Sequence, residues 1–288
     1  MSFGNNERHH LQAYFCIYSF LARKARLTSI NVMTDRPEFY KNIKNQLNLI
    51  PVEPHTLSEW KGKYDFFWRI KIKAIGSICA EYPGEPVLYV DTDTFLFRDF
   101  EEVYRIVDRG HAGMHINEAP LKDVPTRTAR RMYRQLKVRA KATIGDLSGF
   151  NMWNAGIVLT PNTRQLAEID LALRLCDEML AENITDQFIE QYSLAIALHV
   201  TFGLEPLENI IAHYWSNKDE WNLLITGFFQ HCFLENLSVE EIMARFNRIN
   251  LGSLPVYRKI RRTKLRFRRT VDRLFPDRDL SYLDIPQS

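Results

Sequence analysis

Cysteine is scarce in this sequence, and no two cysteines are close enough along the chain to form a local motif. The four residues are Cys16, Cys79, Cys176 and Cys232. None of them forms the C-x-x-C spacing of a zinc or redox site. Each has apolar neighbours, so we expect four buried free thiols, as in proteins kept in a reducing compartment. A disulfide framework and a cysteine-ligated metal site are therefore excluded as the basis of the fold.

Glycine and long apolar runs are also few. Only 12 of the 288 residues are glycine, whereas 12% are aromatic, which favours long helices and a packed core over a turn-rich all-β protein. The apolar run at residues 11–22 is interrupted by Gln12 and Ser19 and is too short to cross a bilayer. It also lacks the basic leader and cleavage site of a signal peptide. We therefore expect a cytoplasmic globular protein.

Positive charge is concentrated toward the C-terminus. The net charge is +3, but residues 257–275 contain nine Lys or Arg and one acid, Asp272, so the rest of the chain is mildly acidic. On a helix, Ile260, Phe267 and Val271 would share one face, and a basic amphipathic helix favours contact with an anionic membrane surface. The alternatives are a solvated helix packed on the body or, less favoured, nucleic-acid binding. We expect peripheral contact with the inner face of a membrane and no nucleic-acid partner.

A second basic stretch spans residues 127–141 and contains no acid. Its basic residues are Arg127, Arg130, Arg131, Arg134, Lys137, Arg139 and Lys141. Such a run is usually a solvated helix face. The functional alternative is a mobile flap over an anionic ligand.

Hydrophobic periodicity predicts an α/β protein. Strands are predicted at 29–34, 48–52, 87–90, 111–116, 150–160 and within 205–214, and helices at 8–25, 37–46, 66–80, 162–182, 186–199 and onward to about 247. Their alternation up to about residue 120 predicts a mostly parallel central sheet flanked by helices. A break near Gly252 and Pro255 separates a domain at 1–250 from a basic helical tail at 251–288.

The chemistry begins where the strand at 87–90 ends. The sequence runs from this apolar strand directly into Asp91-Thr92-Asp93. In extended backbone, residues two apart point to the same side, so both carboxylates can reach one point. Two such acids repel each other unless a cation lies between them, and their oxygens suit Mg²⁺ or Mn²⁺. The alternative is a pair of solvated loop carboxylates, one of which caps a helix.

Several segments, in order, give the sequence a resemblance to nucleotide-sugar glycosyltransferases of the GT-A fold, in the group of glycogenin and the bacterial lipopolysaccharide galactosyltransferases. The resembling segments are Thr34-Asp35, Trp68-Arg69-Ile70-Lys71, the DxD strand, Phe150-Asn151-Met152-Trp153-Asn154-Ala155-Gly156, Asp186-Gln187 and Ile211-Ala212-His213-Tyr214. They cover roughly residues 8–225. The chain departs from the family pattern in two respects. Only Met1 to Phe3 precede the first helix where the family has a strand, and the closing motif has Ser216 and Asp219 where the family has glycine and lysine.

The resemblance implies roles for particular residues. It implies a divalent metal, Mn²⁺ or Mg²⁺, held by Asp91, Asp93 and His213. It implies a donor site formed by Arg69, Thr92, Asn154, Ala155, Gly156 and Lys218, and chemistry at Asp186 and Gln187. Purely structural roles are the alternatives for four of these positions: a core histidine at 213, a β-bulge at 154–156, a helix cap at Asp186, and an ion pair of Arg69 with Asp65.

The sequence therefore predicts a metal-dependent glycosyltransferase. It would move a sugar from a nucleotide diphosphate sugar, such as a UDP-sugar, to a glycan or lipid-linked acceptor, and the resemblance implies retention of anomeric configuration. Inversion would need a carboxylate base, for which Glu118 and Asp146 are candidates. The rival interpretations are a non-catalytic binding protein on the same fold and a sugar nucleotidyltransferase. The second is disfavoured because the start of the chain has no glycine-rich, basic phosphate loop.

Overall fold

The computed structural model describes residues 1–140, 145–163, 165–258, 270–271 and 273–275. The α-helices are α1 (Glu7–Ala22), α2 (Pro54–Lys61), α3 (Arg69–Glu81), α4 (Glu101–Asp108), α5 (Arg127–Gln135), α7 (Ala167–Ala181), α8 (Ile189–Phe202), α9 (Lys218–Leu234) and α10 (Val239–Phe246). Shorter helical segments are η1 (Pro37–Gln46), η2 (Leu121–Asp123), η3 (Leu136–Ala140), η4 (Asp186–Phe188) and η5 (Leu251–Ser253). The strands are β1 (Asn31–Thr34), β2 (Asn48–Pro51), β3 (Val87–Val90), β4 (Thr94–Leu96), β5 (Ala112–Pro120), β6 (Asn151–Thr160), β7 (Leu204–Pro206) and β8 (Ile211–His213).

The strands form three small sheets in the described chain. The largest has the order β3-β6-β5-β7, β1 pairs with β2, and β4 pairs with β8. The long strand β6 runs antiparallel to both of its neighbours, whereas β5–β7 and β1–β2 are parallel. The α/β class with a central sheet is thus as predicted, and β3, β5 and β7 run in the same direction. The central position of β6, whose direction opposes that of β3 and β5, makes the sheet mixed.

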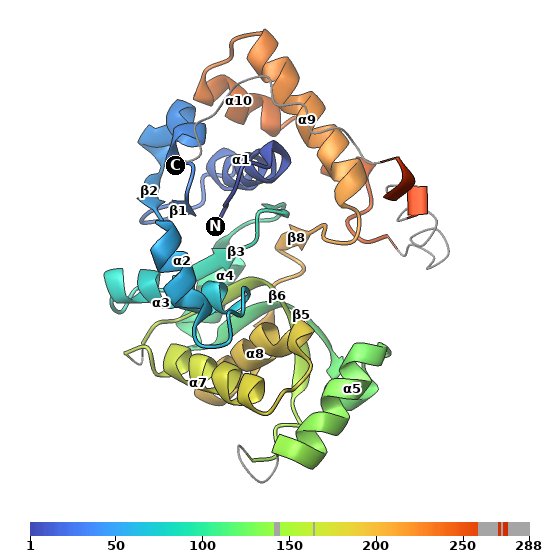
Figure 1. Ribbon diagram of the computed structural model, residues 1–288. Helices are drawn as coiled ribbons and strands as arrows, with labels where there is room; N and C mark the ends of the chain where they lie inside the picture. Colours follow the sequence, from blue (N-terminus) through green and yellow to red (C-terminus); the bar gives the residue numbers. More distant parts are fainter. Residues whose placement is uncertain (141–144, 164, 259–269, 272, 276–288) are drawn as a thin grey trace.

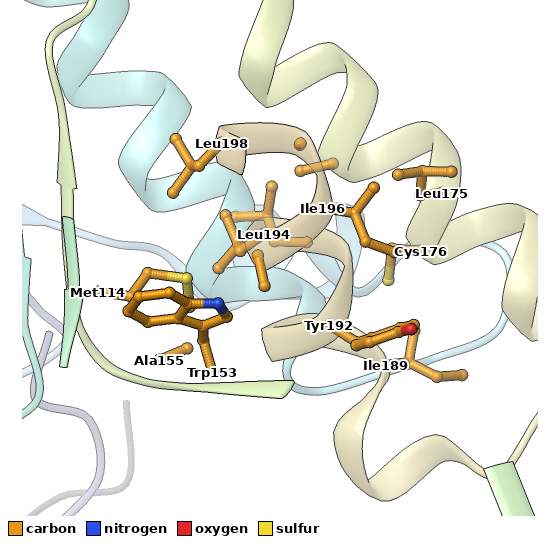
Figure 2. Close-up of a cluster of buried hydrophobic side chains, with 14 of the residues drawn as sticks. Met114, Trp153, Ala155, Leu175, Cys176, Ile189, Tyr192, Leu194, Ile196 and Leu198 are labelled. Atoms are coloured by element: carbon orange, nitrogen blue, oxygen red, sulfur yellow. The ribbon is translucent and has the colours of Figure 1, made fainter. Parts of the chain in front are cut away.

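One core lies between the largest sheet and the helices α3, α5, α7 and α8. Figure 2 shows its centre, where Leu194 of α8 lies toward Trp153 of β6 and Met114 of β5. Cys176 of α7 is also buried there, and all four cysteines are buried free thiols, as predicted. Because α8 is apolar on most of its surface, it lies inside this core, as expected for a helix that is hydrophobic all round.

A second core joins α1, α9 and α10 to the small β4–β8 sheet (Figure 1). Trp221 of α9 is fully buried, with its ring 4.7 Å from that of Phe95 and 5.3 Å from that of Tyr214. Truncating such a residue to alanine typically costs about 3–5 kcal/mol. These rings hold β4 and β8 together, so they fix the segments that directly follow Asp93 and His213.

The turn from β3 to β4 connects the two cores. The strand β3 belongs to the largest sheet, and β4 belongs to the sheet packed under α1. Residues 91–93 form this turn, so the DxD motif lies at the junction of the two packed halves.

The boundary near residue 250 stays a prediction. Leu254 and Val256, beyond it, pack against the second core, and the backbone carbonyl of Pro255 accepts hydrogen bonds from Asn217 and Trp221.

Most predicted elements agree with the structure to within a few residues. The segment 205–214 is an exception, because it holds two separate strands, β7 and β8, divided by a turn at 207–210.

The predicted basic helix at 257–275 falls largely outside the described residues. No helix within the described ranges combines the length and apolar character needed to cross a bilayer.

Candidate metal centre and donor site

The DxD turn is held by backbone hydrogen bonds on both sides. The amide of Asp91 donates to the carbonyl of Gly156 at 2.7 Å, which continues the pairing of β3 with β6. The carbonyl of Asp93 accepts from the amide of Tyr214 at 3.1 Å, which continues the pairing of β4 with β8. The carboxylates therefore converge because a turn is anchored at both ends. The strand alternation assumed from the sequence is not the cause, since residues 91–93 are not extended.

His213 completes a three-residue group with the two acids. It pairs with Thr94 in the β4–β8 register, directly after the DxD turn. Ligand atoms from Asp91, Asp93 and His213 all lie within 4.8 Å of one another. The structure thus brings together the three residues that the sequence predicted as metal ligands. Two carboxylates and one imidazole suit a first-row divalent ion such as Mn²⁺ better than Ca²⁺.

Gly156 makes room for the imidazole. A Cβ atom built on this residue would fall 2.1 Å from Cε1 and 2.2 Å from Nδ1 of His213. No side chain tolerates such an approach, so only glycine allows β6 and β8 to come this close. Gly156 is therefore needed for the close approach of His213.

Asn154 sets the tautomer of His213. Its Oδ1 accepts from the backbone amide of Gly156 at 3.0 Å, so this atom is the amide oxygen and cannot donate. The same Oδ1 lies 3.0 Å from Nδ1 of His213, which must therefore carry the proton. Nε2, the other ring nitrogen, lies 3.3 Å from Asp93 Oδ2 and is the one placed to bind a metal ion beside it. An outer partner that fixes the ring in this way is typical of metal-binding histidines.

Asp93 is a buried carboxylate with cationic or potentially cationic neighbours. Its side chain is only 6% exposed, and Lys218 Nζ lies 2.8 Å from Oδ2. Burial by itself would raise its pKa, but His213 and Lys218 outweigh burial and hold the pKa of Asp93 well below its usual value. Neither neighbour meets Oδ2 in hydrogen-bond geometry, so this oxygen has no hydrogen-bond partner among the described residues. A buried, charged oxygen of this kind fits a metal ligand.

Sequence reasoning missed a network behind Asp91. The ammonium of Lys71, on α3, lies 3.3 Å from Asp91 and 3.3 Å from Glu190, and donates to the carbonyl of Ala155 at 3.0 Å. Burial acts to lower the pKa of Lys71, but Asp91 and Glu190 raise it by more than burial lowers it, so the group stays charged. Tyr89 donates to Asp91 at 2.6 Å. These contacts orient Asp91, and the Lys71–Glu190 pair joins two helices, α3 and α8, that are far apart in sequence.

His115 is a second residue that the sequence did not indicate. It lies on β5 with its ring 5.2 Å from that of His213, edge to face. Burial and the neighbouring imidazole lower its pKa to about 4, so His115 is neutral at pH 7. Its Nδ1 has no hydrogen-bond partner among the described residues. An uncharged ring here supports His213 without adding positive charge to the site.

Arg69 is engaged away from the acids. Its guanidinium binds both carboxylate oxygens of Asp177 on α7, at 2.8 and 3.0 Å, and donates to the carbonyl of Trp60. Asp65, the ion-pair partner considered from the sequence, is instead 3.1 Å from Lys61. Contact of Arg69 with a donor sugar stays a prediction.

Asp186 and Gln187 are exposed at the start of α8. Within the described chain, neither residue forms a hydrogen bond or an ion pair with Asp91, Asp93 or His213, and the buried acid nearby is Glu190, on the first turn of α8. Their chemical role stays a prediction. The side chain of Thr185 makes no capping hydrogen bond to η4.

An apolar cavity of about 290 Å³ adjoins the DxD turn. It lies between β1, β3 and α1, and both Asp91 and Thr92 reach its wall. Thr92 also donates weakly to Gln12 of α1, at 3.4 Å. The chain start lies at the same wall, where Ser2 forms a single parallel bridge with Thr34. Ser2 is the sole residue of the expected first strand that pairs in the described structure.

Comparisons with known proteins gave one family match and weak structural similarities to solved structures. Residues 33–202, more than half of the chain, match the family described as the Rhodobacterales glycosyltransferase domain. Among solved structures, mouse xyloside xylosyltransferase 1 is 13% identical, with a TM-score of 0.45, over 72% of this chain and 83% of that one. The galactosyltransferase LgtC, in complex with donor and acceptor sugar analogues, is 15% identical, with a TM-score of 0.41, over 68% of this chain and 69% of that one. A search of curated proteins gave no match.

Proposed function

We propose that this chain, which belongs to the Rhodobacterales glycosyltransferase family, is a metal-dependent enzyme of the GT-A type that uses a nucleotide diphosphate sugar. The acceptor would be a glycan or a lipid-linked glycan. The observation that carries the proposal is the convergence of Asp91, Asp93 and His213 within 4.8 Å, beside a glycine that leaves room for the imidazole. His213 lies beyond the matched residues 33–202, so its contribution is argued from geometry.

The residues of this group fit a divalent ion, Mn²⁺ or Mg²⁺. The fit rests on the buried Asp93 oxygen, which has no hydrogen-bond partner among the described residues, and on Nε2 of His213 beside it, because the other ring nitrogen faces Asn154. Once bound, such an ion would neutralise the charge that develops on a diphosphate leaving group. Lys71 and Tyr89 hold Asp91 in orientation, and Asn154 holds His213.

The donor would lie across the DxD turn. Its nucleoside end, uridine in our proposal, suits the apolar cavity beside Asp91 and Thr92. Its diphosphate suits the N-terminus of α9, where Lys218 is the first residue and its side chain is 46% exposed. Backbone amides and a lysine at a helix N-terminus favour bound phosphate. Lys218 would then divide its charge between Asp93 and the phosphates.

The sugar end would face β6 and the start of α8. Asn154, Ala155 and Gly156, next to the DxD turn, would contact the sugar, and Arg69 would be a further contact to it. Asp186 and Gln187 would lie at the reacting carbon. We propose retention, in which the acceptor attacks from the side of the leaving phosphate and that phosphate takes the acceptor's proton. Of the two candidate bases for inversion, Asp146 already accepts from the amide and hydroxyl of Ser148.

The experiment is donor hydrolysis with Mn²⁺, using a panel of UDP-sugars chosen by thermal shift. Asp93→Asn should lose metal-dependent hydrolysis and keep a cooperative thermal transition. The matched control is Asp108→Asn, an exposed acid at the end of α4. Equal hydrolysis by Asp93→Asn and the wild type would reject the proposal. An NMR assay of the transfer product decides stereochemistry, and an inverted anomer would reject retention.

Membrane contact is a separate part of the proposal. It rests on the basic sequence at 257–275, most of which lies outside the described residues. Deleting 259–288 keeps Pro255 and its hydrogen bonds to Asn217 and Trp221. We expect the deletion to abolish binding to vesicles of anionic lipid. Unchanged binding would exclude the tail as the membrane contact.

A further inference from the structure

The helix α5 presents a wholly basic face to solvent. Its four arginines are exposed, and together with neighbouring residues they line an open hollow on the surface. The lining residues are Lys122, Arg127, Arg130, Arg131, Tyr133 and Arg134. None of them belongs to the group around Asp91, Asp93 and His213.

The opposite face of α5 fixes these arginines in place. Ala129, Met132 and Leu136 are fully buried and belong to the core under the sheet. At the N-terminus of the helix, the hydroxyl of Thr126 accepts from the amide of Ala129 at 3.0 Å. Since α5 is capped and packed, the guanidinium groups extend from a defined scaffold. Residues 127 and 134 are two turns apart, which spans about 10 Å along the helix.

The positive charges on this face are not balanced by acids. Within the described chain, no carboxylate forms an ion pair with Lys122 or with any of the four arginines. The Nε of Arg134 donates to the carbonyl of Arg130, at 3.3 Å. Like charges three or four residues apart destabilise a helix. A helix that retains this arrangement is suited to an anionic ligand, and the forked guanidinium matches phosphate oxygens in particular.

The last residue of α5 ties the hollow to the candidate active site. Gln135 accepts from the amide and hydroxyl of Thr185, at 3.0 and 2.7 Å, and donates to the carbonyl of Asn183 at 3.2 Å. Thr185 directly precedes Asp186 and the start of α8. That helix carries Glu190, which is 3.3 Å from Lys71, the partner of Asp91. Figure 1 shows α5 on the same side of the sheet as α8.

We propose that the α5 hollow binds the phosphate-bearing part of the acceptor. The acceptor would therefore be anionic, with phosphate groups spread over about 10 Å to match two turns of helix. This inference rests on the proposed transferase function, because it assigns the acceptor of that reaction. The phosphates belong to a glycan or to the lipid that carries it, and the arms of the experiment distinguish these sources.

The experiment is hydrogen–deuterium exchange of the full chain with phytate as a soluble polyphosphate probe, in the presence of EDTA. At a phytate concentration about ten times its Kd, amides of residues 127–135 should exchange about tenfold more slowly. Arg130→Gln/Arg134→Gln should lose this protection. The control, Arg105→Gln/Arg174→Gln, removes two exposed arginines from α4 and α7 and should keep it. Peptides from 257–275 report separately on phytate bound by the tail.

A second arm replaces phytate by vesicles of phosphatidylglycerol in phosphatidylcholine. Protection of 127–135 by phytate alone assigns a soluble phosphorylated acceptor, and protection by both probes assigns a lipid-borne one. Protection by vesicles alone, or protection confined to the tail, overturns the proposal. Asp93→Asn should keep the phytate protection of α5. Loss of the metal function and loss of the α5 site are therefore observed independently.

Discussion

A Cβ atom on residue 156 would fall 2.1 Å from the imidazole of His213. The histidine on β8 can therefore occupy this position only because residue 156 on β6 is glycine. This contact links the segment Asn154-Ala155-Gly156 to His213, which lies 57 residues after the glycine. It explains why a glycine is required in the middle of the buried strand β6, where it would otherwise weaken the strand.

Gly156→Ala should therefore displace His213. Overpacking of this kind typically costs about 1–3 kcal/mol in the free energy of unfolding, which urea denaturation measures. The stabilisation of the protein by Mn²⁺ in a thermal shift assay should also disappear. Gly149→Ala is the matched control, because a Cβ there meets no atom within 4 Å.

The double variant Gly156→Ala/His213→Ala separates the two effects. Removing the imidazole relieves the clash, so much of the lost stability should return while Mn²⁺ stabilisation stays absent. A Gly156→Ala variant with wild-type stability and wild-type Mn²⁺ response would contradict the packing described here.

Lys71→Met should be strongly destabilising. It leaves the buried Glu190 and the half-buried Asp91 without the ammonium between them, and removing one partner of a buried charge network costs about 3–5 kcal/mol. Lys73→Met, two residues along α3 and half-buried, is the control and should change the free energy of unfolding by less than about 1 kcal/mol. Adding Glu190→Gln to Lys71→Met should recover part of the loss. Equal stabilities of the Lys71 and Lys73 variants in urea would show that the network is not a stabilising unit.

The pH dependence of stability should include a small term from Glu205 on β7. Hydrogen bonds from Arg109, together with His111, lower the pKa of this carboxyl below its ordinary value. A depressed pKa in the folded state means that the unfolded state binds more protons as the pH falls. The stabilisation is therefore present above about pH 4.5 and is lost below it.

Urea denaturation between pH 7 and pH 3 measures this term. The wild type should exceed Glu205→Gln by up to about 1 kcal/mol at pH 7, because the pair is partly exposed, and the difference should shrink as the pH falls. Glu208→Gln, an exposed acid three residues along, is the control. A difference that stays constant or grows toward pH 3 would contradict the assignment.

Local pattern predicted much of the fold. Apolar periodicity located α1, α3, β3, β6 and α7 to within a few residues, because each has a continuous buried stripe or run. It missed β4, a strand of three residues, and it merged β7 with β8, because short strands are defined by their partners and not by their own sequence. It did not single out β6 as the strand that runs antiparallel to its neighbours, because strand direction is not encoded in the strand's own apolar pattern.

The candidate site divides in the same way. Asp91, Asp93 and His213 carry a motif that sequence reasoning could use. Lys71 and Glu190 are joined by the packing of α3 against α8. His115 contacts His213 of β8 from a position on β5 where the pairing with β6 shifts register. No spacing in the sequence predicts such contacts. A buried lysine among apolar residues of α3 was the one available signal, and the sequence could not name its partners.

The central claim is that Asp91, Asp93 and His213 bind one divalent ion. Titration of the protein with Mn²⁺, followed by the loss of the free-ion electron paramagnetic resonance signal, measures this directly. We expect one site per chain in the wild type and in Asp108→Asn, and a loss of at least about tenfold in affinity in Asp93→Asn and His213→Ala, since each removes a ligand. Equal Mn²⁺ affinity in all four proteins would contradict the claim.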